Sequence, residues 1–255
     1  MSDLRLAATV MVFRHDSHRI LMVQRSRKMS FFPNAWVFPG GRVDPADAKV
    51  QTKGEVEDLD NPAFAVSAIR ECFEEAGVWL GEGTPSPQLR NKLNHREGNL
   101  LQEPSLVADL ERLELWSRWV TPVAEPKRYD TRFFITQLRE DEGFEAQADQ
   151  FETVASRWFS PQEAVAAHQG GEIFLAPPTY LTLLQMTQFQ NYDAVCAAAK
   201  TQERCEILPI HRKENGFEIL LPGHPDHPKT SPNLGCTSLL LDSGRWLLRG
   251  GVLGT

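Results

Sequence analysis

The 255-residue chain has no block of lysine and arginine residues, and this absence argues against one class of partner. Its 27 Lys and Arg residues are outnumbered by 34 Asp and Glu residues, so the net charge is −7 at pH 7. A surface that binds the backbone of a nucleic acid carries clustered positive charge. We therefore expect no nucleic-acid partner.

The chain is also poor in cysteine and in long apolar runs. Its four cysteines (Cys72, Cys196, Cys205 and Cys236) are scattered, without a Cys-x-x-Cys pair or a spacing typical of disulfides. Residues 1–10 are too short and too polar for a signal peptide, the last three residues are not a peroxisomal address, and no apolar run could span a membrane. We expect a cytoplasmic protein without a membrane partner.

Internal repeats and low-complexity tracts are lacking too, and strands alternate irregularly with helices. This order predicts an α/β protein of the α+β type, with a mixed sheet covered by helices on both faces. Strands are predicted over 4–13, 19–24, 34–38, 116–123, 131–138 and 153–159, with hairpins over 206–221 and 237–249. Helices are predicted over 63–78, 88–93, 105–113 and 161–168, and after Pro177-Pro178 to about residue 200.

The helix predicted over 63–78 is the most informative segment. At about 100° per residue, Glu71, Glu74 and Glu75 fall within roughly 100° of one another, opposite an apolar face that includes Ile69 and Cys72. Carboxylates at these spacings repel each other, and a divalent cation would relieve the repulsion. Two alternatives remain at this point: a solvated acidic surface or a metal site. Cys72 is read as a core residue.

The flanks of this helix carry further signals. Asn61-Pro62 is a typical helix start and Gly77 a typical end. Upstream, Phe38-Pro39-Gly40-Gly41 is followed by Asp47, and two consecutive glycines allow a close approach of the backbone to a ligand. Residues 48–60 are polar and are expected to form a surface insertion.

Together these residues resemble the Nudix box: a glycine, five residues, an acid, a spacer, and then Arg-Glu-aliphatic-any-Glu-Glu-any-Gly-aliphatic. Gly41, Asp47 and the run from Arg70 to Val78 fill this pattern. Two features depart from it, because Asp47 replaces the usual glutamate and 22 residues replace a spacer of seven. The resemblance implies a Nudix-like α/β/α sandwich with additional helices.

The same resemblance implies a diphosphatase that uses Mg²⁺ or Mn²⁺, ions that prefer oxygen ligands. It implies that Glu71, Glu74 and Glu75 bind the metal, together with the Gly40 carbonyl. Arg70 would orient a carboxylate, and Asp47 would be either an outer-shell ligand or a structural partner of Arg70.

The general base has two candidates, Glu71 first and Glu152 second. Glu152 precedes the strand that ends at Phe159, where a further metal-binding acid often lies in this family, but it could equally be an exposed carboxylate. Glu142 and Glu145 are weaker candidates.

Substrate binding is assigned to Gly41, Arg25 and Arg42. Arg25 belongs to a group of three cations at 25–28, which is either a solvated loop or a phosphate contact. We expect Trp116, Trp119 and Trp158 to be core or interface residues rather than a stacking platform for adenine. The segment 224–227 resembles a metal site in composition but is expected to be a flexible tail.

A finer resemblance covers residues 4–223. The lengthened box and the segments 116–123, 127–135, 157–164 and 177–186 are similar to the branch that contains the peroxisomal coenzyme A diphosphatases. We therefore assign residues 1–223 to a Nudix hydrolase domain, with the box over 40–78, an insertion at about 48–60 and a helical excursion at about 85–115. Residues 224–255 form a C-terminal extension.

The expected activity is hydrolysis of a diphosphate bond in a nucleoside diphosphate linked to another group, with coenzyme A or acyl-coenzyme A preferred. ADP-ribose or a dinucleotide (NADH or a diadenosine polyphosphate) is the alternative substrate. A Nudix-fold binding module without turnover is the alternative of another class, and a homodimer is a further expectation.

Overall fold

The computed structural model describes residues 4–29, 32–57, 59–143, 145–203, 206–213, 216–230 and 234–251. Within these ranges the strands are β1 (Leu4–Phe13), β2 (Ile20–Arg25), β3 (Trp36–Val37), β4 (Gly40–Arg42), β5 (Thr52–Lys53), β6 (Gly81–Glu82), β7 (Val107–Asp109), β8 (Glu114–Val120), β9 (Arg128–Gln137), β10 (Thr153–Phe159), β11 (Glu206–Ile207), β12 (Ile210–Arg212), β13 (Phe217–Leu220), β14 (Cys236–Asp242) and β15 (Arg245–Gly251). The helices are α1 (Ala63–Ala76), α2 (Pro87–Asn94), α3 (Pro161–Gln169), α4 (Pro177–Met186) and α5 (Tyr192–Thr201), with short 3-10 helices η1 (Asp47–Lys49), η2 (Leu100–Gln102) and η3 (Leu110–Arg112).

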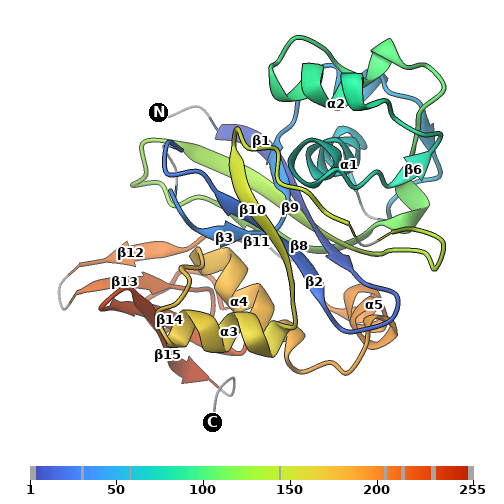
Figure 1. Ribbon diagram of the computed structural model, residues 1–255. Helices are drawn as coiled ribbons and strands as arrows, with labels where there is room; N and C mark the ends of the chain where they lie inside the picture. Colours follow the sequence, from blue (N-terminus) through green and yellow to red (C-terminus); the bar gives the residue numbers. More distant parts are fainter. Residues whose placement is uncertain are drawn as a thin grey trace.

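The main sheet of the described residues has eight strands and lies at the centre of the molecule (Figure 1). Its order is β10-β2-β1-β9-β8-β11, with β3 added to β2 and β4 added to β1. β1 runs parallel to β9, with Leu4 opposite Arg128 and Phe13 opposite Gln137, but pairs antiparallel with β2 and β4. The sheet is therefore mixed, as the sequence predicts.

Alternate residues of β1 belong to two different hydrophobic cores, because successive side chains of a strand point to opposite faces. Val10 and Val12 pack in the core that contains α1 and α2. Met11 and Phe13 pack in the core that contains α3, α4, α5 and the C-terminal strands. Figure 1 shows these two groups of elements on opposite sides of the main sheet. The predicted α/β/α layering is thus confirmed.

Helix α1 begins and ends where the sequence indicates. The Asn61 side chain accepts a hydrogen bond from the Ala63 N–H (3.0 Å), and Pro62 fits the first turn. Gly77 has a φ of 74°, which favours glycine, and its N–H donates to the Phe73 carbonyl. Ile69 and Cys72 are buried, so the predicted apolar face packs against the sheet.

The helix predicted over 105–113 is wrong. Residues 107–109 form β7, which pairs with β5 and β6 in a small three-stranded sheet, and only the 3-10 helix η3 follows. Pairing with two distant strands overrides the local helical preference. The same pairing anchors the box insertion, since β5 lies within residues 48–60.

The segment 206–211 is divided rather than being one strand of a hairpin. β11 joins the main sheet parallel to β8, whereas β12 pairs antiparallel with β13. Pro209 lies between them and has no N–H to offer a strand ladder. Asn215 of the predicted turn lies outside the described residues. Pro177 and Pro178 occupy the first turn of α4 instead of preceding it.

The C-terminal strands form a four-stranded antiparallel sheet, β12-β13-β14-β15. Its predicted hairpin at 242–244 is confirmed, with Ser243 and Gly244 both at positive φ. β13 and β14 pair across residue 223, so the domain boundary proposed there separates two strands of one sheet. The segment 224–227 is not a flexible tail, because His227 is buried and contacts the Leu208 carbonyl at 2.9 Å.

In the described part of the chain, no helix combines the length and the apolar character needed to cross a bilayer.

Candidate active site

Arg70 is the centre of the polar cluster on α1. Its guanidinium donates to both carboxylate oxygens of Asp47, at 2.8 and 3.1 Å, and to the Arg42 carbonyl at 2.8 Å. The same group donates to Glu71 at 2.9 Å and to Glu74 at 2.8 Å. Arg70 is buried, so these bonds fix it in one orientation, and it fixes the two glutamates in turn.

Asp47 acts here as the structural partner of Arg70. Its side chain is buried, and besides the two bonds to Arg70 it accepts a hydrogen bond from the Asp44 N–H at 2.8 Å. A buried carboxylate satisfied in this way holds η1 against α1. Of the two alternatives for Asp47, the geometry favours the structural one.

The glycine turn meets the helix at two points. The Gly40 N–H donates to Glu75 at 2.9 Å. Gly41 lies so close to the Glu71 carboxylate that a Cβ on residue 41 would collide with it. β4 carries both glycines and is held by its pairing with β1, in which Gly40 lies opposite Thr9. The Gly40 amide, rather than its carbonyl, contacts the acidic cluster in this geometry.

The glutamates share an environment that disfavours negative charge. Burial raises the pKa of Glu71 to about 7, and the charges of Glu74 and Glu152 add to this effect while Arg70 opposes it. Burial also raises the pKa of Glu75 well above its ordinary value, with a further contribution from Glu71. The single guanidinium of Arg70 therefore does not neutralise the cluster, and additional positive charge would stabilise it.

The donor set fits a hard divalent cation. The hydrogen bonds described for Glu71, Glu74 and Glu75 use one oxygen of each side chain and leave the other for a ligand. Carboxylate oxygens are the ligands that Mg²⁺ and Mn²⁺ prefer. As the side chains of the described residues stand, no three acidic, His or Cys groups already converge on one point. Arg70 and the Gly40 amide fix one oxygen of each glutamate, and the second oxygens would be available to a metal.

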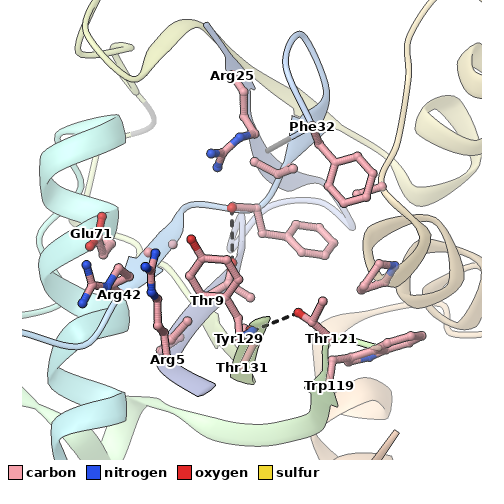
Figure 2. Close-up of a pocket in the computed structure, with 18 of the residues that line it drawn as sticks. Arg5, Thr9, Arg25, Phe32, Arg42, Glu71, Trp119, Thr121, Tyr129 and Thr131 are labelled. Carbon is pink, nitrogen blue, oxygen red and sulfur yellow. Dashed lines mark hydrogen bonds between the residues drawn. The ribbon is translucent and has the colours of Figure 1, made fainter. Parts of the chain in front are cut away.

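All ten residues that the sequence predicts for the site line one cavity of about 930 Å³. They are Arg25, Gly40, Gly41, Arg42, Asp47, Arg70, Glu71, Glu74, Glu75 and Glu152. Figure 2 shows Glu71 and Arg42 together at one end of this cavity, with Arg25 above them in this view. The size is near the upper end of ordinary ligand pockets, which span roughly 300–1,000 Å³.

Glu152, the second candidate base, lines this cavity and is partly exposed. Its carboxylate pairs with Arg96 of the segment after α2 at 3.2 Å, and its backbone carbonyl accepts from the Ser26 N–H. Glu142, in contrast, is held by Arg112 at 2.6 and 2.7 Å and does not line the cavity. Of the weaker candidates, Glu142 is thus committed to a structural pair.

The three cations at 25–28 have different places. Arg25 lines the cavity and its charge favours the ionised form of Glu75, whereas Arg27 and Lys28 are exposed outside the cavity lining. Only Arg25 is therefore placed to contact a substrate phosphate.

Arg5 is another cation of the site, and no pattern in the sequence indicates it. It lines the same end of the cavity as Arg42, and Figure 2 shows the two guanidinium groups close to Glu71 and Tyr129. No ion pair with Arg5 or Arg42 is found among the described residues. Arg5 stands in a strand opposite Tyr129, and only the pairing of β1 with β4 and β9 brings it beside Arg42.

The tryptophans divide between core and cavity. Trp116, Trp119 and Trp158 all pack in the hydrophobic cores, as predicted. Trp119 also lines the cavity, at the side opposite Glu71 in Figure 2.

A mixed sheet between helical layers, with a glycine turn and a glutamate-bearing helix facing one cavity, defines the class of the protein. The chain is a Nudix hydrolase, an enzyme of a class that generally depends on a divalent metal ion.

Comparison with known proteins gives the family. The sequence model of the NUDT19 Nudix domain matches residues 49–186, more than half of the chain, and the chain belongs to this family. The acyl-coenzyme A diphosphatase NUDT19 of Gallus gallus is 30% identical, over 83% of this chain and 73% of that protein. The human protein of the same name is 28% identical, over 82% of this chain and 72% of its own length.

A solved structure shows the same fold. The crystal structure of a NUDIX hydrolase from Alicyclobacillus acidocaldarius has a TM-score of 0.66 and 29% sequence identity. The match covers 79% of this chain and 97% of that one. The predicted resemblance to Nudix hydrolases is thus confirmed.

Proposed function

We propose that the chain hydrolyses the diphosphate bond of coenzyme A and acyl-coenzyme A, with Mg²⁺ or Mn²⁺ bound by Glu71, Glu74 and Glu75. The observation that carries the proposal is the joining of these glutamates and three arginines, Arg5, Arg25 and Arg42, in one cavity. Relatives named acyl-coenzyme A diphosphatase support the choice of substrate.

In this proposal the glutamates of α1 bind the metal, whereas Arg70 orients them. A divalent cation on the glutamates would neutralise the diphosphate and lower the pKa of an attacking water. Arg70 keeps Glu71 and Glu74 in the orientation that such a site needs, and Asp47 keeps Arg70 in place.

The cationic side chains bind and orient the substrate. A diphosphate carries its charge on several oxygens, and guanidinium groups match these oxygens with two N–H donors at a time. Arg5 and Arg42 come from adjacent strands and would bind one side of the substrate, whereas Arg25 would approach it from β2. When the arginines hold the substrate in this way, the phosphorus atom to be attacked faces the glutamates.

Two carboxylates can take the proton of the attacking water. Glu71 accepts a hydrogen bond from Arg70 and is one of the three glutamates proposed to hold the metal, so as the base it would act from within the metal site. Glu152 lines the same cavity and is partly exposed. The choice between them is part of the experiment.

The test is turnover of a substrate panel with and without Mg²⁺ or Mn²⁺, with products resolved by chromatography. The panel contains coenzyme A, acyl-coenzyme A, ADP-ribose, NADH and a diadenosine polyphosphate. We expect metal-dependent release of adenosine 3′,5′-bisphosphate, with the highest kcat/KM on the coenzyme A species. Equal or better turnover of ADP-ribose or NADH would replace the proposed substrate, and binding without turnover would indicate a binding module.

Glu75→Gln tests the metal site within the same panel. The amide has the same size and retains an acceptor for the Gly40 N–H, so the fold should persist while an anionic ligand is lost. We expect kcat/KM to fall about 100-fold or more.

Glu172→Gln, at an exposed glutamate, is the control and should retain activity. Unchanged turnover in Glu75→Gln would reject the metal site, and unchanged turnover in Glu152→Gln would leave Glu71 as the base.

A further inference from the structure

The cavity extends well beyond the glutamates, and its far side is built by the C-terminal sheet. Four side chains of that sheet line it: Phe217 and Ile219 of β13, Leu241 of β14 and Trp246 of β15. We call these four residues the apolar wall. They lie outside the region 49–186 that the family model matches.

The strand register makes this wall continuous. Phe217 lies opposite Leu241, and Leu241 lies opposite Trp246, so the three form one row across three adjacent strands. Ile219 is two residues from Phe217 and therefore lies on the same face of β13. Ile219 and Trp246 are buried, and the Trp246 indole donates to the Leu175 carbonyl at 3.0 Å, which fixes its ring. Phe217 and Leu241 are partly exposed and can meet a ligand.

Apolar groups of other elements complete this part of the cavity. They are Trp119 and Phe133 of the main sheet, Phe174, and the first-turn residues Pro177 and Pro178 of α4. Of the described residues of β12–β15 that line the cavity, none is an Asp, Glu, Lys or Arg, and His211 is the one titratable group. Glu125 of the preceding loop also lines the cavity and contacts His211 at 3.4 Å, and the remaining groups here are apolar, so this part is suited to a flexible and largely apolar group.

The opposite end of the cavity is charged rather than apolar. Arg5 and Arg42 line it near Glu71 (Figure 2). The nucleotide half of coenzyme A carries a 3′-phosphate in addition to the diphosphate, whereas the other half is a pantetheine arm that ends in a thiol or an acyl thioester. Charge complementarity therefore places the nucleotide half at the arginines and the acylated half toward the C-terminal sheet.

We infer that the apolar wall binds the acyl end of an acyl-coenzyme A and sets the preferred acyl chain length. This inference rests on the proposed function, since it assigns the two halves of that substrate to the two ends of the cavity. Because the wall lines the far side of the cavity, we expect chain length to have a limit: added methylenes are favourable until they reach Trp246 and unfavourable beyond it.

The experiment compares kcat/KM for free coenzyme A with that for a series of saturated acyl-coenzyme A esters of increasing length. For the unaltered chain we expect kcat/KM to rise by at most about fourfold per added methylene, which is the value for complete burial of a methylene. Beyond a defined chain length, kcat/KM should decline. Leu241→Trp reduces the space, and should shift the optimum to shorter chains by lowering kcat/KM for long esters more than for free coenzyme A. Phe217→Ala enlarges the space, and should shift the optimum to longer chains.

Leu247→Trp is the matched control. Leu247 lies on β15 next to Trp246, is 45% exposed, and does not line the cavity. The variant adds the same ring to the same sheet, so its chain-length profile should equal that of the unaltered chain. A Leu241→Trp profile identical to that of Leu247→Trp would overturn the inference, as would an equal loss on free coenzyme A and on every ester.

Measurements of Kd distinguish a failure of the inference from a failure of the proposed function. Calorimetric titration of the unaltered chain without divalent metal should give a lower Kd for a medium-chain acyl-coenzyme A than for free coenzyme A, and Leu241→Trp should abolish the difference. Turnover of coenzyme A without any chain-length dependence would overturn the inference alone. No turnover of any coenzyme A species, with no chain-length dependence of Kd, would overturn both.

Discussion

At the scale of single residues, the site depends on Arg70 as much as on the glutamates it holds. One buried guanidinium joins α1 to η1 through Asp47, to β4 through the Arg42 carbonyl, and to Glu71 and Glu74. A lysine could not replace it, because an ammonium lacks the planar set of five donors that reaches these partners together.

Substitution of Gly41 is predicted to lower activity with little effect on the stability of the fold. In Gly41→Ala the new methyl would meet the Glu71 carboxylate, which can swing away because it ends a flexible side chain. We expect the free energy of unfolding to change by less than about 1 kcal/mol and kcat/KM to fall about 10- to 100-fold, with a higher Mg²⁺ requirement, because a ligand is displaced. Urea unfolding and metal titration of turnover measure the two effects.

Gly143→Ala is the control for this substitution. A Cβ at residue 143 meets nothing within 4 Å, so both quantities should stay at the level of the unaltered chain. Full activity of Gly41→Ala at low Mg²⁺ would show that the close approach of Gly41 to Glu71 has no functional role, and a large loss of stability would show that the Glu71 carboxylate does not move aside.

At the scale of elements, an ion pair between Glu142 and Arg112 helps to fix the acidic loop 139–150, alongside the pair between Arg139 and Asp109. Glu142 accepts two hydrogen bonds from the buried Arg112 of η3 and one from the Arg139 N–H. Burial alone would raise the pKa of Glu142, but the bonds from Arg112 and Arg139 outweigh it and lower the pKa below its ordinary value. The ion pair thus links the loop to the small sheet that carries β7.

This pair predicts a pH dependence of stability. A carboxyl with a lowered pKa binds fewer protons in the folded state, so its contribution is complete above about pH 4.5 and is lost as the pH falls through the folded-state pKa. Glu142→Gln should cost about 2 kcal/mol of unfolding free energy at pH 7, because it weakens charge-assisted bonds to a buried arginine. The difference from the unaltered chain should shrink toward pH 3, as urea unfolding at several pH values would measure.

Glu145→Gln, at an exposed glutamate of the same loop, is the control and should have no effect at either pH. A Glu142→Gln difference that stays constant with pH would contradict the assignment. Glu142→Gln should also keep its activity, since Glu142 lies outside the cavity lining.

At the scale of the whole molecule, the C-terminal sheet is attached to the α3–α4 layer by a buried histidine. The Trp246 N–H donates to Nε2 of His168 at 3.2 Å, and Nδ1 of the same ring lies 3.2 Å from the Ile173 carbonyl and 3.3 Å from the Leu175 N–H. Burial lowers the pKa of His168 and keeps the ring neutral, as this arrangement requires. The position of the apolar wall thus depends on a contact between β15 and α3.

His168→Leu tests this attachment. The leucine fills much of the space but leaves the Trp246 N–H without an acceptor, so unfolding should become easier by about 2 kcal/mol. Hydrogen exchange should accelerate in β15 more than in β1 and β9. His95→Leu, at an exposed position, is the control, and uniform acceleration across all strands would contradict a local attachment.

Patterns within a few residues predicted much of the fold and of the metal site. The periodicity and end residues of α1, the strands 4–13 and 153–159, and the three glutamates all follow from local geometry, because a helix or strand fixes which neighbours share a face. Arg25, Arg42 and Glu152 were also predicted, and they reach the cavity together with the glutamates.

The sequence by itself determined that this chain has a glutamate-bearing Nudix helix and a glycine turn to meet it. Tertiary structure alone decided that residues 107–109 are a strand, that Asp47 pairs with Arg70, that Arg5 stands beside Arg42, and that the C-terminal sheet lines the cavity. The reason is physical: each of these depends on pairing between segments far apart in the chain, and local propensity carries no information on which distant segment will become the neighbour.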